Sequence, residues 1–171
     1  GPGDFGASAA TCAAPEAATE APAADLAERP PVGLYVHVPF CVSVCPYCDF
    51  VVLGGAAARG PANRLADFVE ALTVELALRA DALDAIFPDR PPLDSLYLGG
   101  GTPSLLGPEP VARIVGLVRS RYGLAPHAEV TLEANPGHDE RGDARGFVEA
   151  GVTRISYGVQ SLDPAELRRL G

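Results

Sequence analysis

The sequence predicts an α/β fold in which helices cover a parallel sheet. The first observation is that, from residue 32 onward, short β-branched and aromatic stretches alternate with longer stretches whose apolar residues recur at helical spacing. The second is that each of the four strand patterns is followed directly by chemically distinctive residues: three cysteines, a glycine run, a Glu and an Asn, and a Ser, Gly and Gln group. Doubly wound sheets and barrels both fit the alternation, but functional groups collect at consecutive strand ends in barrels. We therefore expect four β/α units of a partial, TIM-like barrel.

The first two β/α units come from the N-terminal half of this region. Residues 33–38 (GLYVHV) are β-branched or aromatic and predict a strand, which Pro39 ends. Apolar residues recur at helical spacing over residues 65–86, and a proline two positions later ends that helix. The second strand is expected at residues 94–101 (DSLYLGGG), where it stops at a glycine run. The second helix is expected at residues 108–122, because prolines are tolerated in a first helical turn.

The next two units follow the same order. Residues 128–136 (AEVTLEANP) predict the third strand, and its closing proline marks the exit. A short helix is expected over residues 139–150, where Gly151 would cap it. Residues 153–158 (TRISYG) predict the fourth strand. Asp163 then begins another helix, since it is an acidic N-cap followed by a proline.

Composition divides the chain into a tail and one incomplete domain. Residues 1–31 are rich in Ala, Pro and acidic residues, with almost no large apolar side chains, and are predicted to be disordered. Residues 32–171 are expected to be the N-terminal part of a longer catalytic domain. The net charge of −9 argues against nucleic-acid binding. The chain shows no targeting signal and no apolar run of about 18 residues, so we expect a cytoplasmic protein without a transmembrane segment.

Three of the four cysteines, Cys41, Cys45 and Cys48, follow the first strand with the spacing C-x3-C-x2-C. Clustered thiols in a chain without a secretory signal indicate metal binding rather than disulfides. Three thiolates can hold three irons of a 4Fe-4S cluster and leave the fourth iron open to a small ligand. The alternative is a zinc ion held by the three thiols and His37, but zinc ligands usually come in C-x2-C or H-x3-H pairs. The cluster is therefore favoured.

The ends of the later strands supply further candidate binding residues. The run GGGTPS, residues 99–104, lacks the Gly-Lys-Ser/Thr ending of a phosphate-binding loop. Without side chains, Gly100 and Gly101 can approach a ligand and are expected to offer it unpaired N–H and C=O groups. Glu133 is expected to accept charge-assisted hydrogen bonds from a ligand hydroxyl or amine, and Gln160 is a similar candidate.

Four motifs, in this order and spacing, resemble the oxygen-independent coproporphyrinogen III oxidase-like radical S-adenosylmethionine (SAM) proteins: YVHVPFCVSVCPYCDF, LGGGTPS, LEANP and GVTRISYGVQS. The resemblance runs from about Gly33 to the end of the chain. It implies the first four units of a partial (β/α)6-type radical SAM barrel. It also implies a 4Fe-4S cluster whose open iron is chelated by SAM, and electron transfer that breaks a carbon–sulfur bond. A reductant such as flavodoxin or ferredoxin would supply the electron.

The resemblance also implies roles for individual residues. The cluster ligands are Cys41, Cys45 and Cys48. The residues that contact cluster-bound SAM are Tyr35, Gly100 and Glu133. The residues that match contacts to a second SAM in the oxidase members are Tyr47, Gly101, Thr102 and Gln160. Further family contacts, an Arg and an Asp, are expected beyond Gly171, and no catalytic residue is assigned.

One position distinguishes two branches of this family. The motif of the true oxidases is similar to C-x3-C-x2-C-x-C, with a fourth cysteine two positions after the third. In this sequence Phe50 takes the place of that fourth cysteine. This is similar to the HemW-like branch, whose members bind haem and deliver it to acceptor proteins. The resemblance therefore implies a haem chaperone whose partners are haem and haem-accepting proteins. The alternatives are an oxidase that decarboxylates coproporphyrinogen III in haem biosynthesis, a zinc-stabilised binding module, and an inactive truncated fragment.

Overall fold

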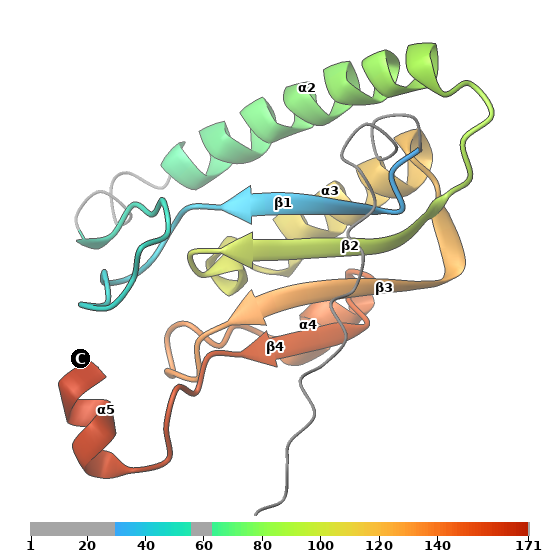
Figure 1. The fold of residues 1–171 in the computed structure, drawn as a ribbon. Coiled ribbons are helices and arrows are strands. Elements are labelled where there is room, and N and C mark those ends of the chain that lie inside the picture. The colour runs from blue at the N-terminus through green and yellow to red at the C-terminus, as the bar shows by residue number, and fades with distance from the viewer. Residues whose placement is uncertain (1–29, 56–62, 171) are drawn as a thin grey trace, which may run out of the picture.

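The computed structural model describes residues 30–55 and 63–170, which form a four-stranded parallel sheet with helices on one face (Figure 1). The strands lie side by side in chain order: β1 (Gly33–Val38), β2 (Leu93–Gly100), β3 (Leu124–Ala134) and β4 (Arg154–Tyr157). This confirms the predicted α/β class. The predicted disorder of the tail concerns residues that lie almost entirely outside the described part.

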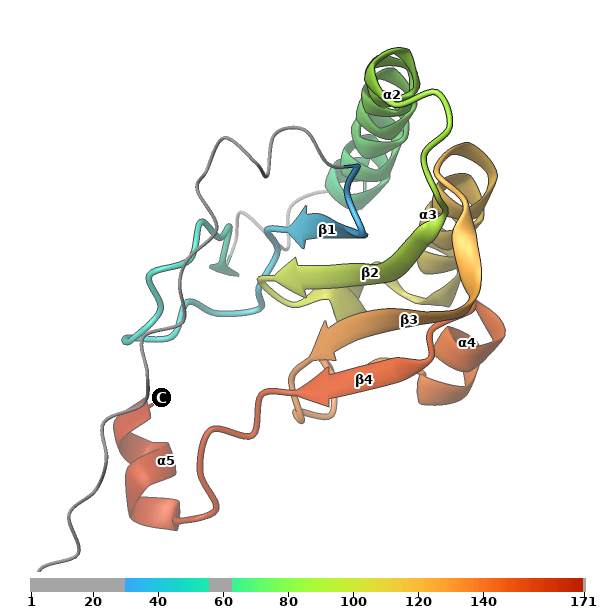
Figure 2. The same ribbon diagram turned by 45° about the vertical axis from the view of Figure 1, so that its right-hand side comes forward.

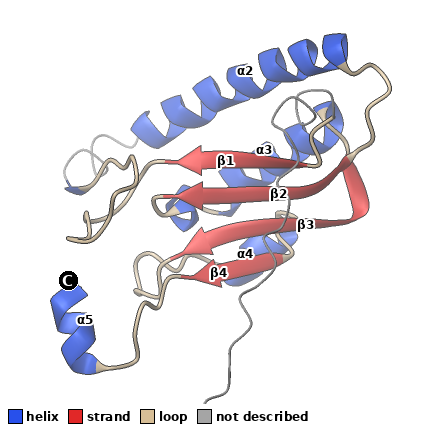
Figure 3. Ribbon diagram, in the orientation of Figure 1, coloured by secondary structure: helices blue, strands red, loops and turns tan. Residues whose placement is uncertain are grey.

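In the part of the chain that the structure describes, four α-helices and one 3₁₀ turn connect and follow the strands: α2 (Asn63–Ile86), η2 (Pro103–Leu106), α3 (Pro108–Arg121), α4 (Ala144–Glu149) and α5 (Pro164–Leu170). Helices α2, α3 and α4 lie on the same face of the sheet (Figures 2 and 3). Helix α5 lies beyond the arrowheads of the strands, away from this layer (Figure 1). None of the helices in the described ranges is long and apolar enough to cross a membrane.

Strand alternation gives the sheet one apolar face and one polar face. Even-numbered residues of the first three strands are buried against the helices: Val36, Val38, Leu96, Leu98, Val130 and Leu132. The helical side of this core consists of Val69, Leu76 and Ala80 from α2, Val111, Ile114, Val115 and Val118 from α3, and Phe147 from α4. Full burial of a Val, Leu, Ile or Phe side chain contributes about 1.5–3 kcal/mol. Tyr35, Tyr97 and Glu133, at odd-numbered positions, lie on the opposite face, whereas Leu93, before the register shift in β2, belongs to the core.

The expected helix over residues 139–150 was wrong at its start, because α4 begins only at Ala144. Gly142 adopts a φ of 66°, a left-handed conformation that interrupts a right-handed helix before Asp143. The Asp143 carboxylate then accepts a hydrogen bond of 3.1 Å from the Gly146 N–H and caps the helix. A Cβ atom on Gly142 would lie 2.5 Å from the Phe147 ring, so the core also requires glycine at this turn.

The third strand begins four residues earlier than expected, at Leu124 instead of residue 128. This segment contains Pro126, which cannot donate to a strand ladder. Pairing with β2 is irregular here, since Leu93 pairs with Leu124 but the register shifts before Ser95. The sequence pattern does not reveal this bulged extension.

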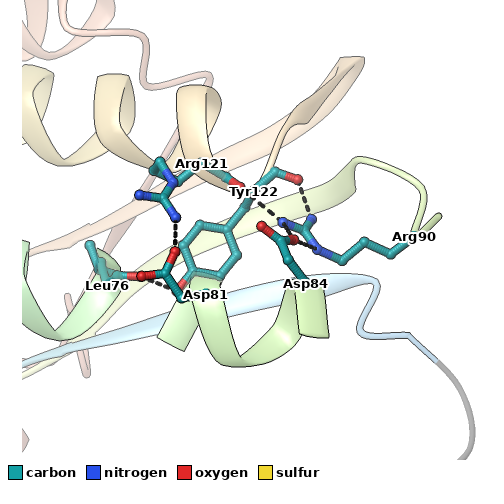
Figure 4. Close-up of polar contacts among 6 residues, drawn as sticks. All are labelled: Leu76, Asp81, Asp84, Arg90, Arg121 and Tyr122. Atoms are coloured by element: carbon teal, nitrogen blue, oxygen red, sulfur yellow. Dashed lines mark hydrogen bonds and ion pairs between the residues drawn. The ribbon is translucent and has the colours of Figure 1, made fainter. Parts of the chain in front are cut away.

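A buried arginine joins the C-terminal ends of α2 and α3 (Figure 4). The Arg90 side chain is 7% exposed and lies 2.8 Å from the Asp84 carboxylate. Its guanidinium donates to the carbonyl oxygens of Arg121 and Tyr122 and lies 5.5 Å from the centre of the Tyr122 ring. The Tyr122 hydroxyl donates to the Leu76 carbonyl at 2.7 Å. The cation thus satisfies carbonyl groups at the negative end of α3.

We expect Arg90→Met to lower the free energy of unfolding by about 1–3 kcal/mol, because it leaves the two carbonyl groups without their donor. Urea denaturation followed by circular dichroism measures the change. The control is Arg79→Met, which removes an i,i+4 pair whose Arg79 and Glu75 side chains are 70% and 55% exposed. That substitution should cost only about 0.5 kcal/mol or less. Equal losses in the two variants would contradict the role given to Arg90.

Candidate functional site

The loops that follow the four strands line one cleft of about 200 Å³. All four strands point toward this edge of the sheet, as the arrowheads in Figure 1 show. Nine of the ten residues predicted to bind metal or cofactor line the cleft: Cys41, Cys45, Tyr47, Cys48, Gly100, Gly101, Thr102, Glu133 and Gln160. The structure therefore brings together residues that are up to 119 positions apart in the sequence (160 − 41).

The cysteine loop begins and ends at a short stem that is fixed to the domain. The Leu53 N–H donates to the Pro39 carbonyl at 2.6 Å, and the Cys41 N–H donates to the Leu53 carbonyl at 3.0 Å. An isolated bridge pairs Phe40 with Leu53. The Phe40 ring packs edge-on against Phe68 of α2, with 5.3 Å between ring centres. The stem thus holds both ends of the loop beside the C-terminal end of β1.

The three thiols differ in burial. Cys41 is buried, whereas Cys45 and Cys48 are half-buried. The pKa of the Cys41 thiol is raised, first by burial and then by the nearby Cys48 and Cys45, while a hydrogen bond with Thr102 opposes the change. No three His, Cys, Asp or Glu side chains of the described ranges are grouped so that they could hold a single metal ion. The three thiols line the same cleft, and the thiolates that hold a cluster each bind a different iron.

His37 connects β1 to the end of the cysteine loop. Its Nε2 lies 2.8 Å from the Val51 carbonyl oxygen, which can only accept, so Nε2 carries the proton. Its Nδ1 then accepts from the Tyr35 hydroxyl at 3.0 Å. Because both ring nitrogens are engaged, the structure does not present His37 as a zinc ligand.

Tyr35 is the one predicted binding residue that does not line the cleft. Its side chain is 55% exposed and borders a separate hollow between β1 and α2. Its ring stacks on Tyr97, with 6.0 Å between ring centres. Burial, followed by the nearby Glu133 carboxylate, raises the pKa of the Tyr35 hydroxyl. Tyr35 is therefore linked to the cleft through Tyr97 and Glu133.

Glu133 is held in a defined orientation at the end of β3. One carboxylate oxygen accepts from the Tyr97 hydroxyl at 2.6 Å, and the other accepts from the Gly100 N–H at 3.1 Å. The hydrogen bond to Glu133 raises the pKa of Tyr97. A Cβ atom on Gly99 would lie within 3.0 Å of Glu133, Tyr97 and Tyr35, so glycine lets these side chains cross β2. Among the described residues that line the cleft, Glu133 is the only Asp, Glu, Lys, Arg or His, which favours a cationic ligand.

The glycine run does not offer the unpaired N–H groups that the sequence led us to expect, and that expectation was wrong. The Gly100 N–H donates to the carboxylate just described. The Gly101 N–H donates to the Val38 carbonyl at 2.8 Å, and the Thr102 N–H donates to the Phe40 carbonyl at 2.6 Å. A Cβ atom on Gly101 would lie 2.6 Å from the Phe40 carbonyl oxygen. Glycine is needed here because β2 ends in close contact with the stem of the cysteine loop.

Sequence reasoning placed Asn135 at a strand end but did not assign it to the site, and it missed Glu140. The Asn135 amide donates to the Thr102 hydroxyl oxygen at 3.2 Å and to the Glu140 carboxylate at 3.1 Å. The Thr102 hydroxyl in turn lies 3.7 Å from the Cys41 sulfur. Tyr97 was also missed, although its odd-numbered position in β2 places it on the polar face of the sheet. No local pattern signals Glu140, because a loop brings it back to the strand ends.

The last strand end contributes backbone conformation as well as side chains. Gln160 has a φ of 66°, the only positive value at a non-glycine residue in the described part of the chain. Such conformations are strained and cluster at ligand sites. The Gly158 N–H donates to the Ala134 carbonyl at 3.0 Å, which fixes the start of this segment against β3. Across the cleft, a hydrogen bond with Cys45 raises the pKa of the Tyr47 hydroxyl.

Comparison with known proteins identifies relatives that are similar to this chain in sequence or fold. The heme chaperone HemW of Mycobacterium tuberculosis is 43% identical over 140 residues, which are 82% of this chain and 34% of the relative. The heme chaperone HemW of Escherichia coli is 39% identical over 146 residues, which are 85% of this chain and 36% of the relative. The solved structure of the Escherichia coli coproporphyrinogen III oxidase HemN, a radical SAM enzyme, matches with a TM-score of 0.69 and 27% identity. That match covers 84% of this chain and 31% of the oxidase.

The chain spans about a third of the length of the curated relatives it matches. A relative in Mus musculus, radical S-adenosyl methionine domain-containing protein 1, mitochondrial, is 36% identical over 93% of this chain and 36% of its own length. The family model of the radical SAM superfamily matches residues 35–171, which include the cysteine loop and all four strand ends. The chain therefore belongs to the radical SAM superfamily.

Proposed function

We propose that this chain binds a 4Fe-4S cluster through Cys41, Cys45 and Cys48 and binds SAM in the adjoining cleft. The observation that carries the proposal is that the three thiols share one cleft with a single, oriented carboxylate and with no basic side chain from the described residues. Three thiolates leave one iron of a cubane without a protein ligand. When bound, the reduced cluster supplies the electron that splits the sulfonium of SAM.

The remaining predicted contacts divide between two positions around the cluster. We propose that Tyr35, Gly100 and Glu133 stabilise the cluster-bound SAM. A second SAM, if the oxidase arrangement applies, would contact Tyr47, Gly101, Thr102 and Gln160. Because the Thr102 hydroxyl donates to Cys41 and accepts from Asn135, it keeps one acceptor lone pair for a contact with SAM. The Glu133 carboxylate keeps acceptor capacity beyond its two hydrogen bonds and can receive a ligand hydroxyl or ammonium group.

The wider function that we propose is haem chaperoning: binding haem and passing it to acceptor proteins. Two relatives at 43% and 39% identity are heme chaperones, which supports this choice. Phe50 borders the cleft and is 68% exposed. It occupies the position at which the oxidase motif has its fourth cysteine. A flavodoxin or ferredoxin would be the reductant. The cytoplasmic location and the tail and domain boundaries stay predictions.

Coproporphyrinogen III oxidation is the second candidate, because the solved oxidase HemN shares the fold at 27% identity. A zinc-stabilised module is less well supported, since the His37 Nε2–H donates to the Val51 carbonyl and Nδ1 accepts from the Tyr35 hydroxyl. An inactive truncated product would show neither cluster nor SAM binding.

Anaerobic reconstitution with iron and sulfide should give a protein with bound iron, bound sulfide and the broad visible absorption of an iron–sulfur cluster. Each of Cys41→Ala, Cys45→Ala and Cys48→Ala should lose the full cluster, because each removes the ligand of a different iron. Cys12→Ala is the matched control and should retain the parent's iron and sulfide content. Bound zinc without iron, or a full cluster in any of the three variants, would contradict the assignment.

Glu133→Gln should weaken SAM binding by about ten- to a hundredfold, since a charge-assisted hydrogen bond contributes about 1.5–3 kcal/mol. Equilibrium dialysis of SAM against the reconstituted protein measures the change. Glu129→Gln is the matched control, because Glu129 lies on the same face of β3 but contacts Thr131 and Arg154 and does not line the cleft. Equal weakening in the two variants would mean that Glu133 acts only through the overall charge of this face.

Haem titration should give a stable haem complex with the reconstituted protein, and incubation with coproporphyrinogen III, SAM and reductant should give no vinyl product. A Soret band followed during titration measures haem uptake, and chromatography of the porphyrins detects product. Formation of the vinyl product would establish the oxidase instead. If the protein neither takes up haem nor forms the vinyl product, the chaperone function is rejected for this chain.

A further inference from the structure

The buried cysteine receives a hydrogen bond from a side chain that is itself buried. The Thr102 hydroxyl lies 3.7 Å from the Cys41 sulfur, and Thr102 is 1% exposed. Cys45 raises the pKa of the Tyr47 hydroxyl, but Tyr47 is 46% exposed. A hydrogen bond that is shielded from water is electrostatically stronger than one at the surface. The contact between Thr102 and Cys41 is therefore the one with more influence on its sulfur.

The direction of this hydrogen bond is determined by residues that do not touch the sulfur. The Glu140 carboxylate can only accept, so it faces the NH2 group of Asn135, at 3.1 Å. The same NH2 group lies 3.2 Å from the Thr102 hydroxyl oxygen and donates its other hydrogen to it. The Thr102 hydroxyl, which has one proton, is thereby left to donate that proton to the Cys41 sulfur.

The geometry points to a hydrogen-bond relay from Glu140 through Asn135 and Thr102 to Cys41 that raises the reduction potential of the cluster. Donation to a cluster sulfur stabilises the more negative, reduced state, and hydrogen bonds to the sulfurs are among the factors that determine cluster potentials. Thr102 and Asn135 are thus positioning residues for electron transfer. This inference rests on the proposed function, because it requires a cluster on the three cysteines.

The relay also connects two strand ends with the cysteine loop. Thr102 follows β2 and Asn135 follows β3, while Cys41 follows β1. The Thr102 backbone N–H donates to the Phe40 carbonyl, which fixes the threonine beside the residue that precedes Cys41. A shift of either strand end would therefore change the hydrogen bond at the sulfur. The packing of the sheet thus fixes the direction in which the Thr102 hydroxyl donates its proton.

The test is a potentiometric titration of the reconstituted chain, with the reduced cluster followed by electron paramagnetic resonance. Thr102→Val removes the hydroxyl without changing charge or shape, and its potential should shift to a more negative value. Asn135→Leu should shift the potential in the same direction by a smaller amount, because the hydroxyl remains but is no longer oriented. Thr102→Ser keeps the donor and should stay close to the parent.

Thr131→Val is the matched control. Thr131 is also 1% exposed and loses the same hydroxyl, but that hydroxyl bonds to Glu129 and not to a cysteine. A potential in Thr102→Val equal to that of the parent, or an equal shift in Thr131→Val, would overturn the relay. If Thr102→Val assembles no cluster, the comparison of Asn135→Leu with Thr102→Ser decides, and an unshifted Asn135→Leu overturns the proposal.

The outcome separates this inference from the function on which it rests. A parent chain that assembles no iron–sulfur cluster would refute the proposed function. A parent chain with a normal cluster whose potential is insensitive to Thr102 and Asn135 would refute the relay alone.

Discussion

The close approach of β2 to the stem of the cysteine loop is the constraint on which the rest of the site depends. Two consecutive N–H groups, from Gly101 and Thr102, donate to the carbonyls of Val38 and Phe40. There is no room for a Cβ atom on Gly101. These bonds place the Thr102 hydroxyl beside Cys41 and bring the cysteine loop over the end of the sheet. The glycine run is thus a packing element of the fold as well as part of the lining of the cleft.

The alternation of side chains across the sheet separates stability from function. Most of the core residues of β1, β2 and β3 are even-numbered and pack against α2, α3 and α4, whereas several odd-numbered residues form a polar network that leads toward the cleft. Tyr35, Tyr97 and Glu133 belong to this network although they come from three strands. A parallel register without bulges between Leu34 and Val38 keeps these side chains in line across β1 and β2. The apolar core can therefore hold the sheet while the polar face changes its contacts with ligands.

The fold class, the strand order along the chain and most of the cleft could be predicted from the sequence, because they depend on local patterns. Cys41, Cys45 and Cys48 lie close in sequence, and parallel strands necessarily present their ends at one edge. The partners of these residues could not be predicted in the same way. The bond between Tyr97 and Glu133 depends on strand register, and that between Asn135 and Glu140 depends on the path of a loop. The start of α4 was misplaced because the left-handed conformation of Gly142 is not marked by the residues around it.

The solitary carboxylate of the cleft has a consequence for ligand discrimination. ATP shares its adenosine group with SAM but carries several negative charges where SAM carries a sulfonium. A triphosphate bound in the described part of the cleft would lie beside the Glu133 carboxylate and would meet like charge. If the cleft binds SAM as proposed, this repulsion would favour SAM over ATP without requiring a shape that rejects ATP.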